Sequence, residues 1–226
     1  MLNLCIIPAR GGSKRIPRKN IKDFLGKPII AYSIEIAQNS GLFDEIMVST
    51  EDTQIAEIAK EFGAKVPFLR SNTNSNDFAV LADVVDEVLA NYKSQGLDFE
   101  YACCILPTAP LIQLDYFTES FRVLKTCKFD SIRPVVKFSY PIQRAVRMDE
   151  EFKISFFNPE FSKTRSQDLE PAYHDAGQFY WFKTEKGLKG IEKYGFEVDP
   201  RFVQDIDNEE DWKMAEWKYS YLKNKN

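Results

Sequence analysis

The sequence has very few of the residues from which metal centres and disulfide frameworks are built. It contains one histidine and four cysteines in 226 residues, and no two cysteines form a CxxC pair. A structural zinc site takes four such ligands at short spacings, so a zinc centre of this kind is excluded. We therefore expect Cys5, Cys103, Cys104 and Cys127 to be free thiols in a reducing compartment.

The chain also lacks a basic excess and a long apolar run. Its net charge is −4, from 30 basic and 34 acidic residues, whereas general binders of nucleic acid or anionic membranes are usually basic. The apolar run at residues 2–7 has no basic region before it and is too short for a signal peptide or a membrane span. We expect a cytoplasmic protein that binds neither nucleic acid nor membrane.

Strand-like and helix-like segments alternate through much of the chain. Short apolar runs predict strands at 2–7, 45–49, 65–69, 101–106, 131–137 and 178–182. Apolar residues at helical spacing predict helices at 28–38, 53–62, 79–92, 114–125 and 209–222. For the second helix, Asp52 is the expected N-cap and Gly63 the expected C-terminal stop. Such alternation is typical of an α/β domain with a mostly parallel sheet and flanking helices.

The alternation changes after Val136. Two short segments, 144–148 and 152–156, flank a polar turn and predict a hairpin, and residues 158–175 are polar and irregular. No linker separates these segments from the rest. We interpret the whole chain, 1–226, as a single domain in which residues 138–177 form an inserted hairpin-and-loop lobe.

A dense group of cations follows the first expected strand. Residues 6–20 read IIPARGGSKRIPRKN, with two adjacent glycines and five lysines or arginines. Open α/β sheets bind ligands at the carboxyl ends of their strands, and glycines let backbone N–H groups approach an anion. Neither the P-loop pattern GxxxxGK[ST] nor the dinucleotide pattern GxGxxG is present. We interpret the loop as a polyphosphate site of another kind; a solvated basic loop is the alternative.

Two aspartates near the C-terminus, Asp205 and Asp207, are separated by one residue at the end of an extended segment. Mg²⁺ takes one or two carboxylates and completes its shell with phosphate oxygens and water. Beside a triphosphate loop, this pair predicts a magnesium site. The alternative is that Asp207 caps the last helix and Asp205 is simply exposed.

The segment 165–180, RSQDLEPAYHDAGQFY, is rich in hydrogen-bonding and aromatic side chains. This mixture suits a polar, carboxylated sugar, whose carboxylate Arg144 or Arg165 could bind. An arm that contacts a second subunit would have a similar composition and is the alternative. The loop 106–110, LPTAP, is expected to form either one wall of the sugar pocket or only a rigid turn.

Taken together, these motifs resemble those of a known family. PARGGSKRIPRKN, VSTED, PFLRS, LPTAP, RSQDLEPAYHDAGQFYW and QDIDNEEDW occur in the order found in CMP-sugar synthetases, the acylneuraminate cytidylyltransferase family, which activate nine-carbon acidic sugars. PIQRA at 141–145, SQDLE and YHDAGQFYW look most like the branch that acts on pseudaminic acid. Leu106 replaces a glutamine of the neuraminate enzymes and Ala176 replaces an asparagine, and both changes disfavour neuraminate itself.

The resemblance implies a Rossmann-like nucleotide-sugar transferase fold with a mostly parallel mixed sheet. It also implies a homodimer in which the small inserted dimerisation lobe reaches toward the partner's site. CTP and an acidic nine-carbon sugar would react, with Mg²⁺, to give the CMP-sugar and pyrophosphate. The alternatives are a synthetase for N-acetylneuraminate, legionaminate or another keto-sugar acid, and a non-catalytic nucleotide-binding regulatory protein. Intact Lys19, Asp205 and Asp207 favour an enzyme.

By motif position, the resemblance implies three groups of site residues. The nucleotide-binding group is Ala9, Arg10, Gly11, Gly12, Ser13, Lys14, Lys19, Asn20, Arg70 and Asp77. The sugar-binding group is Gln143, Arg144, Arg165, Gln167, His174, Asp175, Gln178 and Tyr180. The metal ligands are Asp205 and Asp207, and the catalytic residues are Arg10, Lys19 and Asp207.

Overall fold

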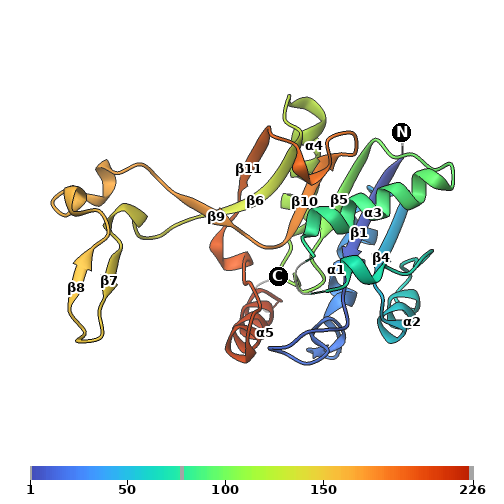
Figure 1. Ribbon diagram of the computed structural model, residues 1–226, viewed down its shortest axis with the longest axis horizontal. Helices are drawn as coiled ribbons and strands as arrows, with labels where there is room; N and C mark the ends of the chain where they lie inside the picture. The colour runs from blue at the N-terminus through green and yellow to red at the C-terminus, as the bar shows by residue number, and fades with distance from the viewer. Residues whose placement is uncertain (1, 77–78, 224–226) are drawn as a thin grey trace.

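A seven-stranded sheet with helices on both faces forms the body of the molecule (Figure 1). The structure is a computed structural model that describes residues 2–76 and 79–223. The strands of the sheet are β1 (Asn3–Pro8), β4 (Glu45–Ser49), β5 (Tyr101–Ile105), β6 (Ser131–Lys137), β9 (Tyr173–Asp175), β10 (Phe179–Lys183) and β11 (Lys193–Glu197). Their order is β11-β6-β10-β5-β1-β4, and β9 also pairs with β6.

Five of these strands run in one direction. β1 pairs parallel with both β4 and β5, and β11 pairs parallel with β6. β10 lies between β5 and β6 and is antiparallel to both, so β5 and β6 run the same way. β9 is also antiparallel to β6. The expected mostly parallel mixed sheet is confirmed, and the carboxyl ends of β1, β4 and β5 lie at one edge.

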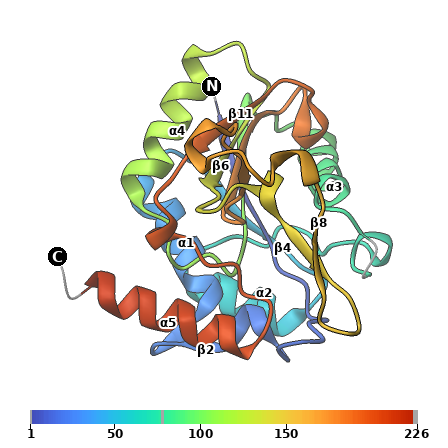
Figure 2. The same ribbon diagram turned by 90° about the vertical axis from the view of Figure 1, so that its left-hand side faces the viewer.

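The helices are α1 (Ile29–Ser40), α2 (Thr53–Glu61), α3 (Leu81–Ser94), α4 (Leu114–Thr126) and α5 (Glu209–Lys223). Figure 2 shows α3 and α4 on opposite faces of the sheet. Apolar residues of α1, α2 and α4 pack in one core with Trp181, whereas α3 packs in a second core with Phe182. Successive residues of β10 thus face opposite sides of the sheet. Among the described residues, no helix is long and apolar enough to cross a membrane.

The final helix, α5, packs away from these two cores. Its Trp212 joins Ile16 from the loop after β1, together with Phe24 and Tyr32, in a separate buried cluster. Phe24 belongs to a small hairpin of β2 (Asp23–Phe24) and β3 (Lys27–Pro28). This packing holds the segment before α5, which contains Asp205, against the loop that follows β1.

The expected helix ends are confirmed for α2. The Asp52 carboxylate accepts a hydrogen bond from the Ile55 N–H at 3.0 Å and so caps the helix. Gly63 follows the helix in the left-handed region, with φ of 87°.

Two expectations about strands need correction. Residues 65–69 make only one isolated bridge, between Met47 and Lys65, because Pro67 offers no N–H for a ladder. β11 has no counterpart among the expected strands, since Gly195 interrupts its apolar pattern and weakens the strand signal. Tyr194 and Phe196 nevertheless pack against the first core.

Residues 138–172, called the arm below, leave the body between β6 and β9 (Figure 1). The predicted hairpin is confirmed as β7 (Val146–Met148) and β8 (Ile154–Phe156), which pair antiparallel. Its apolar side chains are uncovered: Met148 is 63% exposed, Phe152 79% and Ile154 65%. The last three residues of the segment expected to be irregular, 158–175, form β9 of the main sheet.

Candidate functional site

A cavity of about 520 Å³ lies where the loops leave β1 and β5. Six of the predicted nucleotide-binding residues line it: Arg10, Ser13, Lys14, Lys19, Asn20 and Arg70. Leu106, Pro107 and Thr108, from the loop after β5, form part of the opposite wall. Ala9, Gly11 and Gly12 belong to the same loop as Arg10, and Asp77 lies outside the described residues. The cationic loop, residues 10–20, therefore forms one wall of an open cavity.

A hydrogen bond between Asn20 and Arg10 joins the two ends of the cationic loop. Asn20 is buried, and its side-chain amide donates to the Arg10 carbonyl oxygen at 2.9 Å. The Gly11 N–H was expected to face an anion, but it already donates to the Glu51 carboxylate at 2.7 Å. Side-chain cations, more than this amide, are thus the groups that the loop offers to a phosphate.

Arg70 lies deeper, beneath the cavity. Its Nε donates to the Ser49 hydroxyl at 3.0 Å, and a second guanidinium nitrogen donates to the Ser49 carbonyl oxygen. Burial lowers the pKa of Arg70, although the nearby Glu51 charge opposes this shift. The guanidinium is therefore fixed in position by the end of β4.

Lys19 joins the cationic loop to the two predicted metal ligands. Its Nζ donates to the Ile206 carbonyl oxygen at 2.6 Å. Burial lowers the pKa of Lys19, against the opposing charges of Asp207 and Asp205. Arg15, which was given no individual role, lines the cavity and pairs with Asp207 at 2.8 Å. The structure thus brings together groups that are almost the whole chain apart in sequence.

The two aspartates differ in their surroundings: Asp205 is partly desolvated, whereas Asp207 is paired with Arg15. Burial raises the pKa of Asp205, and the neighbouring charge of Asp207 raises it further. Asn208 caps α5, because its side-chain oxygen accepts from the Glu210 and Asp211 N–H groups at 2.9 and 3.0 Å. The alternative in which Asp207 caps this helix is therefore wrong.

The donor set near Asp205 fits a metal ion that arrives with its substrate. Across residues 2–76 and 79–223, no group of three or more His, Cys, Asp or Glu side chains is arranged to hold a metal. Two carboxylates alone fit Mg²⁺ when phosphate oxygens and water complete the shell.

Part of the predicted sugar-binding group lies in the body, next to Asp205. The Asp175 carboxylate accepts from the Tyr180 hydroxyl at 3.2 Å and from the Gly177 N–H at 2.8 Å. A Cβ on Gly177 would lie 3.8 Å from the Asp205 carboxyl carbon, so these residues are neighbours. Burial, followed by the Asp175 charge, raises the pKa of Tyr180.

Arg133 is a residue of this region that the sequence interpretation missed. It donates to Asp175 at 3.3 Å, and its guanidinium lies 5.4 Å from the Tyr180 ring centre. The signal that could have identified it was a cation in the interior of β6, between Ile132 and Pro134. A cation at this place suits the carboxylate of an acidic sugar.

Two further sugar candidates have structural partners. Gln178 is buried, and its amide donates to the Phe202 carbonyl oxygen at 2.6 Å. The His174 ring contacts Phe138, with ring centres 4.9 Å apart, and its Nδ1 lies 2.9 Å from the Asp175 carbonyl oxygen. His174 therefore lies where the arm joins the body.

The other four sugar candidates are on the arm, which projects away from the body (Figure 1). Arg165 pairs with Asp168 at 2.8 Å, and Arg144 donates to the Ser166 hydroxyl at 3.4 Å. Gln143 donates to the Glu170 carbonyl oxygen at 2.9 Å. Gln167 lines a separate cavity of about 360 Å³ within the arm. The structure does not bring these four together with the nucleotide residues of the same chain.

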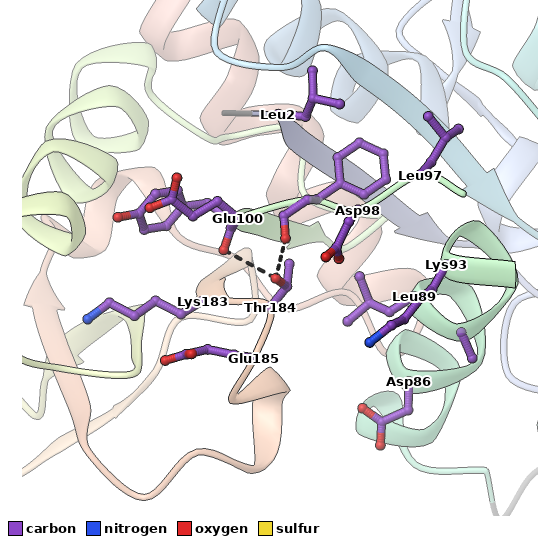
Figure 3. Close-up of a pocket in the computed structure, with 13 residues that line it drawn as sticks. Leu2, Asp86, Leu89, Lys93, Leu97, Asp98, Glu100, Lys183, Thr184 and Glu185 are labelled. Atoms are coloured by element: carbon purple, nitrogen blue, oxygen red, sulfur yellow. Dashed lines mark hydrogen bonds between the residues drawn. The ribbon is translucent and has the colours of Figure 1, made fainter. Parts of the chain in front are cut away.

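A larger cavity, of about 950 Å³, lies at the other end of the strands (Figure 3). Leu2 and Tyr101, at the starts of β1 and β5, line it together with residues of α3. Figure 3 shows the Thr184 hydroxyl donating to the carbonyl oxygens of Phe99 and Glu100. None of the predicted site residues lines this cavity. Because ligands of open α/β sheets bind at the carboxyl ends of strands, the smaller cavity is the better candidate site.

The chain is similar in sequence to known proteins. A family model described as cytidylyltransferase matches residues 4–222. A Campylobacter jejuni protein named pseudaminic acid cytidylyltransferase is 44% identical, with 97% of each chain covered. A Legionella pneumophila protein named CMP-N,N'-diacetyllegionaminic acid synthase is 29% identical over 94% of each chain.

A solved structure has the same fold. It is a CMP:2-keto-3-deoxy-manno-octonic acid synthetase complexed with CTP, with a TM-score of 0.70 and 16% sequence identity. The superposition covers 98% of this chain and 100% of that chain. The expected α/β Rossmann-like fold is confirmed.

Proposed function

Since the chain belongs to the cytidylyltransferase family, we propose that it transfers CMP from CTP to the anomeric C2 hydroxyl of pseudaminic acid and releases pyrophosphate. One observation carries the proposal. Lys19 and Arg15 of the cationic loop line the cavity, and the Asp205–Asp207 pair lies beside these two cations, although it comes from the opposite end of the chain. This arrangement supports a site for a triphosphate with its metal ion.

The reaction is an in-line displacement at the α-phosphorus of CTP. The C2 hydroxyl oxygen forms a bond to that phosphorus and its proton passes to solvent water, while the bond to the bridging oxygen of the departing pyrophosphate breaks. Negative charge grows on the phosphoryl oxygens and on the leaving group. Arg10 and Lys19 line the cavity and would stabilise this charge. A single donor of this kind contributes about 3 kcal/mol, or about a hundredfold in rate.

Cytidylyltransferases generally need a divalent metal ion, and we propose Mg²⁺ held by Asp205 and Asp207. The ion would neutralise charge on the triphosphate. Asp207 must first leave its ion pair with Arg15, which frees the arginine for a phosphate oxygen. The test is Asp207→Asn: we expect weaker Mn²⁺ binding, measured by electron paramagnetic resonance, and a higher Mg²⁺ requirement. An unchanged metal dependence would argue against ligation.

The choice of sugar rests on the walls of the site and on the named relatives. Leu106 lines the cavity at a position where neuraminate enzymes carry a glutamine. An apolar group there suits a sugar with fewer hydroxyls, such as a dideoxy diacetamido sugar. The name of the Campylobacter jejuni relative supports the same substrate.

A panel of sugar acids tests the proposed function. Pyrophosphate release from CTP would be measured with pseudaminic acid, legionaminic acid, N-acetylneuraminic acid and an eight-carbon keto acid. We expect the highest kcat/KM with pseudaminic acid. A preference for another acid moves the chain to that synthetase, and CTP binding without turnover on any acid would make it a non-catalytic binder.

We also propose that the enzyme works as a homodimer in which the arm completes the partner's sugar pocket. The exposed apolar hairpin and the projection of the arm, which carries Arg165, away from the body (Figure 1) support this arrangement. Exposed apolar patches of this kind mark interaction surfaces. Sedimentation analysis should give twice the monomer mass of 26.2 kDa, and a monomer with full activity would rule the arrangement out.

A further inference from the structure

The VSTED motif at the end of β4 lies against the cationic loop, and the proposed function gives it no role. β1 and β4 are parallel neighbours, with Pro8 opposite Ser49. The Ala9 N–H donates to the Ser49 carbonyl oxygen at 2.9 Å, so the segments that follow β1 and β4 leave the sheet side by side. Glu51 and Asp52 therefore reach the loop directly.

The first contact fixes the Gly11 end of the loop. The Glu51 carboxylate accepts from the Gly11 N–H at 2.7 Å. A Cβ built on Gly11 would lie 2.5 Å from an Asp52 carboxylate oxygen, which is closer than real atoms approach. Only glycine lets the loop lie on this carboxylate.

The second contact fixes the Arg18 end. The Arg18 guanidinium donates two hydrogen bonds to the Asp52 carboxylate, at 2.5 and 2.9 Å. These bonds hold the pKa of Asp52 at about 2. Arg18 has φ of 55°, a left-handed conformation that a non-glycine residue keeps only when its surroundings enforce it. The next residues, Lys19–Ile21, form the turn that places Lys19 and Asn20 in the cavity.

We propose that Asp52, together with Glu51, is a positioning residue that sets the geometry of the triphosphate loop from outside the cavity. Asp52 is not among the residues that line the cavity, yet it contacts both ends of the loop and caps α2. It thereby fixes Arg10 and Lys19 relative to each other. Small displacements of such charges are costly in rate, because they must match the transition state. The inference rests on the proposed function in one respect, that the loop binds a triphosphate.

Kinetics of five variants test this role. Asp52→Asn keeps an acceptor that caps α2 but loses the charge that pairs with Arg18. Arg18→Ala removes the partner, and the double variant removes both. Glu119→Gln is the matched control, because it breaks a comparable pair with Arg122 at 2.6 Å on α4, away from the cavity.

We expect kcat/KM for CTP to fall about tenfold in Asp52→Asn and in Arg18→Ala. The double variant should fall no further than the poorer single variant, because both changes remove one contact. KM for the sugar should stay as in the wild type, whereas a general loss of folded enzyme would lower every rate equally. Arg18→Lys should recover part of the loss, and Glu119→Gln should behave as the wild type.

Amide hydrogen exchange of residues 10–20, measured without ligand, is the readout that does not depend on activity. Exchange should accelerate in Asp52→Asn and Arg18→Ala but not in Glu119→Gln. Wild-type exchange and kinetics in Asp52→Asn, or additive losses in the double variant, would overturn the positioning role. A wild-type chain that binds no CTP by calorimetry would instead overturn the proposed function, and the exchange data would still decide whether Asp52 holds the loop.

Discussion

The nucleotide end of the body and the arm differ in how their polar side chains are satisfied. At the nucleotide end, bonds join residues that are far apart in sequence, as between Lys19 and Ile206. On the arm, Arg165 and Arg144 bond only to neighbouring arm residues, and the apolar hairpin is uncovered. The first region is thus held together by long-range contacts, whereas the second combines local polar contacts with an uncovered apolar surface.

This difference divides the proposed reaction into two halves. The triphosphate half should depend on single side chains within each subunit. The sugar half should depend on contact between subunits, because Asp175 and Tyr180 lie in the body and Arg165 lies on the arm. Variants in each region can therefore separate the two halves.

The largest effect is expected in the nucleotide half. Lys19→Ala removes a partly buried ammonium that faces the triphosphate, and kcat should fall about a hundredfold at saturating CTP. Pyrophosphate release measures this change. The control is Lys65→Ala, which removes an exposed partner of Glu45 and should leave the rate unchanged. Near-normal turnover in Lys19→Ala would contradict the electrostatic role.

A somewhat smaller effect is expected when the arm is detached. Ile154→Lys places a charge on the exposed hairpin and should split the dimer, as sedimentation would show. Turnover should then fall about tenfold through the sugar KM, while CTP affinity stays as in the wild type. Equal losses of CTP affinity and sugar turnover would mean that the two regions are not separate. Lys153→Gln, on the same hairpin, is the control for surface charge.

Mixing two inactive variants sharpens the comparison further. Lys19→Ala spoils the body site, and Arg165→Ala spoils the arm. In an equal mixture, half of the dimers contain one subunit of each variant. If the arm acts on its partner's site, each of these mixed dimers holds one intact site. Activity should then recover to about one quarter of the wild type. Activity no higher than the mean of the separate variants would place the arm in its own subunit's site.

The nucleotide half could be predicted from the sequence because its parts are compact motifs. The loop from Arg10 to Asn20 is continuous, and its preceding strand gave its place at the sheet edge. The prediction that the Asp205–Asp207 pair lies near the loop used chemistry instead of sequence position, since a triphosphate binds with a metal ion and the ion needs carboxylates. The ion pairs of Asp52 with Arg18 and of Arg15 with Asp207 could not be predicted, since ion-pair partners depend on packing.

The sugar half was less predictable for a physical reason. Residues 165–180 read as one polar segment, yet the chain turns from arm to sheet at β9, which separates Arg165 from Tyr180. Composition does not reveal such a turn. Likewise, Asp207 and Asn208 are both good N-caps by type, and only the backbone geometry selects Asn208.

The smallest expected effect concerns the kind of contact that each region makes. The loop is held by charge through Asp52, whereas the hairpin offers apolar surface, so acid should weaken the first contact and not the second. The pKa of Asp52 is about 2 in the folded chain and 3.8 as its ordinary value, so ionised Asp52 stabilises the fold above pH 5.

This stabilisation is lost as the pH falls through 4 toward 2, because the folded carboxylate then takes up its proton. The gap in unfolding free energy between wild type and Asp52→Asn should be about 1 kcal/mol at pH 7, given partial exposure of the pair. It should shrink steadily below pH 4. Urea unfolding at several pH values measures the gap, and a gap that stays constant down to pH 2.5 would show that Arg18 does not hold this carboxylate.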